Sequence, residues 1–385
     1  MDNLPEHSPL GASGAYRWMV CPGSVLLAQG VSDAESEYAM EGTLAHHVAQ
    51  ACLSTEQDAW ERMSHSENIT KDMADAVQVY LDNLRYSYPD RQQDKFFVEY
   101  SFHCPDLHPL FYGQADAVYI DEANRTLHVH DYKHGAGIVV DVKENLQCMY
   151  YACGVLEAMQ LRADVDKVVL HIAQPRGWHT DGPLRHWGIS TLDLEAWLDD
   201  VLLPAMKHAE VSRDTLSGEH CRFCPVRKMD CPQISKDFDE LEELMTLITD
   251  KGGAKNLSAA KLGRFLTLFD VAKIISKSAN ETAFARLSAG KKVPGRKLAH
   301  GRANRTWKDD AEDACVKKFG DKAYAERKLK SPAQMEAMPE GEKLTAEFAF
   351  KPDAGLTVVA AGDARAAVSK DTKSLFTDAS KKGKK

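Results

Sequence analysis

The chain has 385 residues, 44% of them apolar, and a formal net charge of −9, which allows a full packed core and excludes a small disulfide-stabilised scaffold. No apolar run approaches the roughly 20 residues needed to cross a bilayer, and the first residues, "MDNLPEHSPLGASG", lack the basic and apolar regions of a signal peptide. We therefore expect a cytoplasmic protein with no membrane partner, whose nine cysteines are thiols or metal ligands.

Apolar spacing predicts two helices, over residues 35–54 and 73–88, and then a strand over residues 96–102. Residues 115–120 and 126–132 are rich in β-branched and aromatic side chains and flank a turn-forming segment, which predicts a hairpin. The later elements expected are a helix over 142–159, a strand over 167–173, an edge strand over 187–190 and helices over 192–211 and 259–287. This order predicts an α/β core with a mixed sheet and helices on its faces.

Three charged side chains interrupt the hairpin where strand propensity favours apolar residues. With the turn centred near Ala123 and Asn124, antiparallel pairing puts Asp116 roughly opposite Asp131, and the period of two puts Asp131 and Lys133 on one face. Facing carboxylates repel each other unless a cation lies between them, so a divalent metal is expected here. The alternative is a set of solvated charges on an exposed face.

The segment "EHCRFCPVRKMDCP" contains a C-x2-C-x6-C array formed by Cys221, Cys224 and Cys231. Three thiolates this close indicate a metal, and a structural site takes its fourth ligand from elsewhere in the chain. Cys21, which is also followed by proline, is the candidate. Spacing alone leaves zinc and an iron–sulfur cluster open, and His220 is an alternative ligand for zinc.

The charge is unevenly distributed along the chain. Residues 291–385 contain 22 Lys and Arg against 14 Asp and Glu, a net charge of +8, which leaves −17 for residues 1–290. Basic and aromatic side chains alternate over residues 291–310, a composition suited to phosphate contact and base stacking. The candidate DNA-binding residues are Lys291, Lys292, Arg296, Lys297, Arg302, Arg305 and Trp307. A solvated basic loop without a partner is the alternative.

Short motifs in a fixed order resemble those of RecB-like nucleases of the PD-(D/E)XK superfamily. They are "EGTLAHH" with His46, "GQAD" with Asp116, "HDYK" with Asp131 and Lys133, and "QCMYY" with Gln147 and Tyr151. The cysteines, one before this core and three after it, resemble the iron–sulfur staple of AddB-type and CRISPR-associated members. The resemblance covers about residues 10–235, although Ala115 stands where the motif name has proline. The pattern through "GKKVPGRKLAHGRANRTW" is also similar to a phage and prophage family known as a domain of unknown function.

The resemblance implies an α/β, restriction-endonuclease-like core with helical additions and an iron–sulfur staple. It further implies a Mg2+- or Mn2+-dependent DNA nuclease, an exonuclease of phage recombination or DNA end processing. The metal ligands would be His46, Asp116 and Asp131, with Glu99 as an additional candidate. The implied catalytic residues are Asp116, Asp131, Lys133, Gln147 and Tyr151. A catalytically silent DNA-binding or scaffold protein is the alternative.

The staple would be a [4Fe-4S] cluster bound by Cys21, Cys221, Cys224 and Cys231, with structural zinc as the alternative. DNA is the expected partner, together with a single-strand annealing or other recombination protein, while the oligomeric state stays open. Four parts are expected along the chain. They are a nuclease core closed by the cysteines over 1–235, a helical extension over 236–290, a basic DNA-contacting segment over 291–330 and a loosely ordered tail over 331–385.

Overall fold

The computed structural model describes residues 5, 7–31, 37–89, 91, 94–228 and 231–297, which all belong to one compact unit, Met1–Arg302. None of the described helices combines the length and the apolarity that crossing a membrane requires. The predicted tail and most of the predicted basic segment lie outside the described residues, so the expected four-part division stays a prediction.

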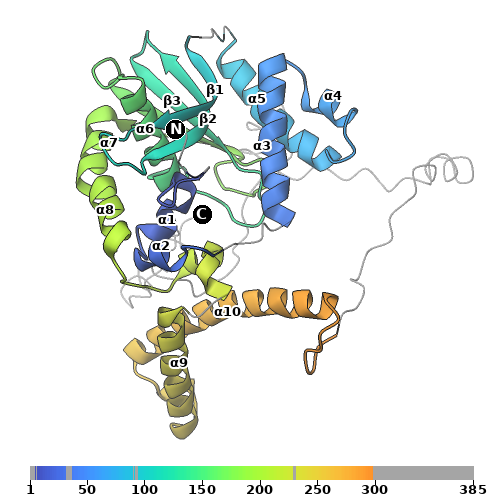
Figure 1. The fold of residues 1–385 in the computed structure, drawn as a ribbon, viewed down its shortest axis with the longest axis vertical. Coiled ribbons are helices and arrows are strands. Elements are labelled where there is room, and N and C mark those ends of the chain that lie inside the picture. The colour runs from blue at the N-terminus through green and yellow to red at the C-terminus, as the bar shows by residue number, and fades with distance from the viewer. Residues whose placement is uncertain are drawn as a thin grey trace, which may run out of the picture. The chain divides into compact units, whose positions relative to one another are not determined.

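A five-stranded mixed sheet lies at the centre of this unit, with its strands in chain order (Figure 1). Its strands are β1 (Phe96–His103), β2 (Tyr112–Asp121), β3 (Thr126–Tyr132), β4 (Lys167–Ala173) and β5 (Leu184–Ser190). Strands β3 and β4 pair in parallel and every other neighbouring pair is antiparallel. A parallel pair needs a long crossover connection, and the segment between β3 and β4 contains a helix that provides it.

Helices cover both faces of the sheet (Figure 1). On one face, α3 (Glu37–Thr55) and α5 (Lys71–Ser87) enclose a core with the sheet. On the other, α6 (Leu146–Ala158), α7 (Thr191–Trp197) and α8 (Leu203–Val211) enclose a second core. A mixed sheet between two helical layers is consistent with a restriction-endonuclease-like α/β fold, so the predicted fold class is confirmed.

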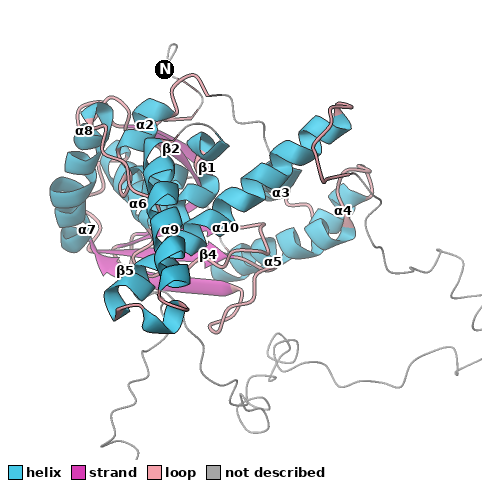
Figure 2. Ribbon diagram, turned by 90° about the horizontal axis from the view of Figure 1, so that it is seen from below, coloured by secondary structure: helices cyan, strands magenta, loops and turns pink. Residues whose placement is uncertain are grey.

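The remaining helices lie before, within and after this core (Figure 2). They are α1 (Ala15–Trp18), α2 (Gly23–Leu27), α4 (Ala59–Met63), α9 (Pro232–Asp250) and α10 (Ala259–Ser288). Leu241 and Leu244 of α9 pack against Leu268 of α10. The expected helical extension is therefore a pair of packed helices.

Two helices depart from the expected bounds for local reasons. Helix α6 begins at Leu146, later than predicted, because the side chain of Asn145 accepts a hydrogen bond from the Cys148 amide and caps the helix. The helix expected over 192–211 is interrupted by a π-helical turn at Leu198–Leu202. The proline in the first turn of α8 has no amide hydrogen to donate back into the preceding turn, which accounts for the interruption.

Candidate metal centre and four-cysteine site

The β2–β3 hairpin brings its two carboxylates together as the pattern predicted. Ala117 pairs with His130, and the next residues along the two strands are Asp116 and Asp131. The Tyr132 amide donates a hydrogen bond of 2.6 Å to Asp116 Oδ2, which fixes this carboxylate beside β3. The hairpin therefore holds Asp116 in place through the backbone.

Next to Asp116, strands β1 and β2 reverse the faces of the sheet to which their alternate side chains point. Val98 packs into the core under α3 and α5, whereas Tyr100 packs into the opposite core, although residues two apart in a regular strand share a face. Their partners on β2 divide between the two cores in the same way. Glu99 lies at this point with a left-handed φ of 52°, opposite Asp116. This break in the alternation of side chains therefore brings Glu99 beside the hairpin carboxylates.

Three side chains from three elements converge here, namely His46 of α3, Glu99 of β1 and Asp116 of β2. One potential ligand atom of each lies within 4.8 Å of the other two. His46 Nδ1 is 3.4 Å from Asp116 Oδ1. The His46 ring also meets the Tyr132 ring edge to face, with 5.5 Å between centroids, which orients the imidazole.

Asp131 belongs to a neighbouring chain of contacts centred on Lys133. Lys133 Nζ lies 2.7 Å from Asp131 Oδ2 and donates to Asp131 Oδ1 at 3.0 Å and to Gln147 Oε1 at 2.8 Å. Gln147 in turn donates to the Tyr151 hydroxyl at 3.0 Å. The predicted catalytic side chains of β3, of Lys133 directly after it and of α6 thus lie in one hydrogen-bonded row. We call this row together with His46, Glu99 and Asp116 the carboxylate centre.

Protons on His46, Glu99 and Lys133 offset the negative charge of the carboxylate centre. Burial alone would lower the pKa of His46, but Asp116 outweighs burial and raises it to about 9. Burial, followed by the charge of Asp116, raises the pKa of Glu99 to about 7. Burial would also lower the pKa of Lys133, yet Asp131 raises it, so this lysine is an ammonium ion. A divalent cation bound by His46 would replace the imidazole proton.

The residues present fit a hard divalent cation. Two ligands on opposite sides of Mg2+ lie about 4.2 Å apart, and the ligand atoms of His46, Glu99 and Asp116 all lie within 4.8 Å of one another. Asp131 Oδ2 is buried and, among the described residues, has no hydrogen bond of good geometry despite its distance of 2.7 Å from Lys133. Two or three carboxylates and one imidazole suit Mg2+ and Mn2+. Glu99, an additional candidate in the sequence, lies closer to the His46–Asp116 pair than the predicted ligand Asp131 does.

The four-cysteine site is formed by Cys21, Cys221, Cys224 and Cys231. The charges of these sulfurs are close enough to interact, and all four residues are free thiols. Burial, as the largest effect, raises the pKa of Cys221 to about 11. Without a metal this thiol is therefore protonated near neutral pH, whereas metal coordination would ionise it.

Backbone contacts bring Cys21 to the array. The Gly23 amide donates to the Asp214 carbonyl at 2.8 Å, and the Leu216 amide donates to Cys21 Sγ at 3.4 Å across 195 residues of sequence. A Cβ atom at Gly23 would lie 2.7 Å from the Asp214 carbonyl oxygen, so this approach requires glycine. His220 Nε2 lies 2.7 Å from the Leu216 carbonyl oxygen, so Nε2 carries a hydrogen and only Nδ1 of His220 could bind a metal.

Arg17 is a charged neighbour of this site that the sequence analysis did not identify. It precedes Cys21 by one helical turn, and the Cys21 amide donates to its carbonyl oxygen at 2.8 Å. The charges of Cys224 and Cys21 act on its guanidinium. The spacing of four residues before a candidate ligand was the signal available in the sequence.

The candidate DNA-binding residues divide between described and undescribed parts of the chain. Exposed positions in the segment after α10 hold Lys291, Lys292, Arg296 and Lys297. The other three, Arg302, Arg305 and Trp307, lie outside the described residues.

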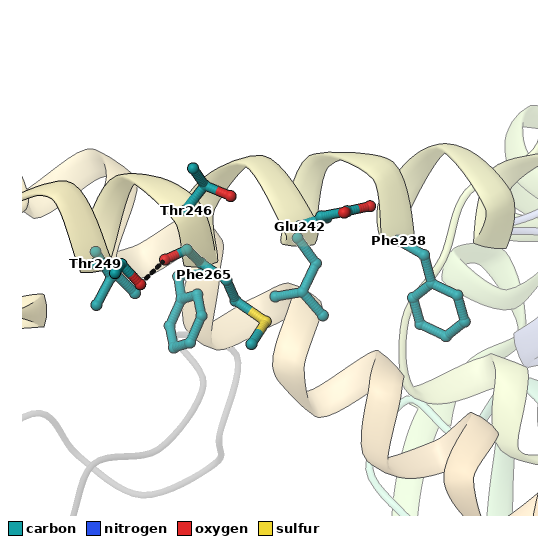
Figure 3. A pocket seen from close by; sticks show the side chains of 8 residues that line it. Phe238, Glu242, Thr246, Thr249 and Phe265 are labelled. Carbon is teal, nitrogen blue, oxygen red and sulfur yellow. Dashed lines mark hydrogen bonds between the residues drawn. The ribbon is translucent and has the colours of Figure 1, made fainter.

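A separate hollow of about 500 Å³ opens between α9 and α10 (Figure 3). Its lining includes Phe238, Leu241, Met245 and Phe265 and a single charged side chain, Glu242. None of the predicted site residues lines it. The carboxylate centre therefore depends on other elements of the fold.

A family model described as "Protein of unknown function (DUF2800)" matches residues 7–366. The match includes both candidate sites and the segment after α10. The sequence had indicated a family of this kind. The chain belongs to the DUF2800 family.

Proposed function

We propose that the protein is a metal-dependent DNA nuclease of the RecB-like type in the PD-(D/E)XK superfamily. The observation that carries the proposal is the convergence of His46, Glu99 and Asp116 beside the Lys133–Asp131 pair. We further propose an exonuclease of phage recombination or DNA end processing, working with a single-strand annealing or other recombination protein. That part of the proposal rests on the sequence resemblance alone.

Phosphodiester hydrolysis requires charge stabilisation at the phosphate, an activated water and a stabilised leaving oxygen. A bound Mg2+ or Mn2+ supplies Lewis acidity and a more acidic water. Asp116 would hold it together with His46, Glu99 and Asp131.

Lys133 has an electrostatic role in this proposal. Its ammonium already bonds Asp131 and Gln147, so its position is fixed before substrate binds. A fixed positive charge beside the scissile phosphate stabilises the additional negative charge of the transition state. Gln147 and Tyr151 hold the lysine from α6 and orient it.

The basic segment after α10 would bind the DNA backbone without reading sequence. Each phosphate that Lys or Arg neutralises releases counterions, so binding weakens as salt rises. Replacing Lys291, Lys292, Arg296 and Lys297 by Gln should reduce the affinity for DNA and flatten its salt dependence. Cleavage at saturating DNA should survive.

The four-cysteine site is proposed to hold a [4Fe-4S] cluster. Thiolates around one zinc ion lie about 3.8 Å apart, since each Zn–S bond is about 2.3 Å long. Among the described residues, no three of the cysteine sulfurs lie within 4.8 Å of one another. The wider spacing favours a cluster in which each thiolate binds its own iron. Structural zinc is the alternative.

The proposal is tested by digesting end-labelled linear DNA, single- and double-stranded, beside a closed circle. Cleavage of the linear forms should require Mg2+ or Mn2+ and stop with EDTA. Asp116→Asn should abolish it, whereas Asp239→Asn, which changes an exposed aspartate of α9, should not. A circle that is cut would indicate an endonuclease.

The second candidate is a catalytically silent DNA-binding or scaffold protein. It is favoured if DNA binds with a normal salt dependence but no DNA form is cleaved with either metal. The intact set of Asp116, Asp131 and Lys133 argues against it, because pairing the buried Asp131 with the half-buried Lys133 costs desolvation energy that binding alone does not require.

A further inference from the structure

The guanidinium of Arg17 lies beside Ser24, three residues after Cys21, and has no carboxylate partner among the described residues. Its Nη1 atom donates a hydrogen bond of 2.7 Å to the hydroxyl of Ser24, which is 2% exposed. Among the described residues, no carboxylate lies within ion-pair distance of it. The groups whose charges act on it are Cys224 and Cys21.

Arg62, which is also partly buried, likewise donates to a hydroxyl, that of Thr55, but the setting of Arg17 differs from those of three other buried or partly buried arginines. Arg85 pairs with Asp58, and Arg176 pairs with Glu41. Arg185, which is 4% exposed, has no carboxylate either, but it donates to the carbonyl oxygens of Gly182 and Val140 and to a side-chain amide. Arg17 has neither an ion pair nor such a set of carbonyl acceptors among the described residues.

A partly buried cation facing neutral thiols loses hydration without receiving compensation. Burial accordingly lowers the pKa of Arg17, and Cys224 and Cys21 oppose that change. Thiolates bound to a metal would supply the missing negative charge. Four thiolates around a [4Fe-4S]2+ core, or around Zn2+, leave a net charge of about −2 next to the guanidinium.

We propose that Arg17 is the counter-charge of the four-cysteine site, positioned one helical turn before Cys21 and fixed by Ser24. This inference rests on the proposed metal occupancy of that site and is independent of DNA cleavage. Reduction of a [4Fe-4S] cluster adds one electron from the external reductant to an already negative site. Arg17 therefore stabilises the reduced form more than the oxidised form and raises the midpoint potential.

The test uses the full-length chain reconstituted anaerobically with Fe2+ and sulfide. The variants are Arg17→Gln, which removes the charge, and Arg17→Lys, which keeps it. Arg222→Gln is the matched control, because Arg222 lies between Cys221 and Cys224 but is exposed and bonds Glu219. The measurements are the midpoint potential, by optical redox titration, and the rate of iron loss to a chelator.

Arg17→Gln should shift the potential to a more negative value and release iron about tenfold faster. Arg17→Lys should restore most of both, and Arg222→Gln should match the wild type. A folded Arg17→Gln variant with wild-type iron content and potential would overturn the proposal. If Arg17→Gln holds no cluster, Arg17→Lys decides, since a failure of both variants would show that packing rather than charge is required.

If the wild-type chain binds zinc instead of iron, the variants are compared by their zinc affinity, measured by chelator competition. Arg17→Gln should then bind zinc more weakly than the wild type. A wild-type chain that binds neither metal overturns the inference. The nuclease proposal is tested separately, because Asp116→Asn keeps Arg17 and all four cysteines. Loss of cleavage in that variant with a normal cluster separates the two proposals.

Discussion

The carboxylate centre is assembled mainly from neighbouring pieces of chain, whereas the four-cysteine site joins pieces from opposite ends of the core. Asp116, Asp131 and Lys133 share one hairpin, and Gln147 follows on the next helix. Cys21 instead meets a segment 195 residues away in sequence. The first site positions charges on one hairpin and the elements beside it. The second connects the ends of that fold.

The two sites therefore differ in what their loss should change. If the proposed functions hold, removing a carboxylate ligand would remove chemistry and leave the hydrophobic cores on both faces of the sheet in place. Removing a cysteine ligand would release the N-terminal helices from the segment after α8. We expect the first to be seen in activity and the second in stability.

The largest expected effect is that of Cys21→Ser on stability. A crosslink that closes a loop of about 200 residues is worth on the order of 4 to 5 kcal/mol in the chain-entropy model. The wild type should be brown after anaerobic purification, with about four irons and four sulfides per chain. Cys21→Ser should lose the colour and unfold at lower denaturant, as measured by guanidinium titration.

Cys52→Ala is the matched control for Cys21→Ser, because Cys52 is fully buried in the core under α3 and α5 and takes no part in the four-cysteine site. It should lose some packing energy but keep its iron. A Cys21→Ser variant with wild-type metal content and stability would show that the four-cysteine site does not connect the two ends.

The next effect is that of Asp116→Asn on cleavage. The rate should fall at least about 100-fold, or roughly 2.7 kcal/mol, because the amide keeps an oxygen but loses the negative charge that holds the cation. The melting temperature should stay close to that of the wild type. Asp131→Ala is a less clean test, because it also leaves Lys133 buried without its counter-charge. Retained cleavage by Asp116→Asn would remove this residue from the chemistry.

A smaller effect concerns acid and the sheet that holds the carboxylate centre. Burial, followed by the charges of His128 and His186, lowers the pKa of His171 to about 3. Because an unfolded histidine has a pKa near 6.5, the unfolded chain binds more protons below that pH. The contribution of neutral His171 to the free energy of unfolding is therefore fully present above about pH 6.5, and the free energy of unfolding falls by about 2 kcal/mol by pH 5. In His171→Gln the denaturation midpoint should depend less on pH between about 6.5 and 5 than it does in the wild type. The prediction is contradicted if the plots of midpoint against pH for the two proteins are parallel.

Much of this fold follows from patterns that sequence displays directly. The richness in β-branched and aromatic residues predicts β3 at its observed bounds, and the turn between the strands predicts the register that sets Asp116 beside Asp131. Helical spacing predicts α3, α5 and α10 within a few residues. These features are local, so hydrophobic period and turn chemistry determine them.

The role of Glu99 could not be predicted with the same rules. A period of two puts Val98 and Tyr100 on one face, and the left-handed φ at Glu99 breaks that alternation. The sequence has no glycine there to indicate that the side-chain faces of the strand reverse. Arg17 is similar, because its importance depends on contacts across most of the chain.

The smallest expected effect is that of Glu99 on metal affinity, and it tests whether β1 belongs to the carboxylate centre. Glu99→Gln keeps an oxygen but loses the charge, so Mn2+ should bind about tenfold more weakly, or roughly 1.4 kcal/mol. The measurement is a Mn2+ titration by calorimetry or electron paramagnetic resonance. Glu122→Gln, at the exposed hairpin turn, is the control and should bind like the wild type.

Glu99→Gly separates the metal role from the backbone role. A left-handed φ costs a non-glycine residue on the order of 1 kcal/mol, and glycine removes that cost while losing a similar amount of conformational entropy. Glu99→Gly should therefore weaken Mn2+ binding at nearly unchanged stability, which is the pattern of a strained residue kept for a ligand. If both variants bind Mn2+ as tightly as the wild type, the ligand set is His46, Asp116 and Asp131. The left-handed φ at Glu99 in β1 would then have a reason other than the metal.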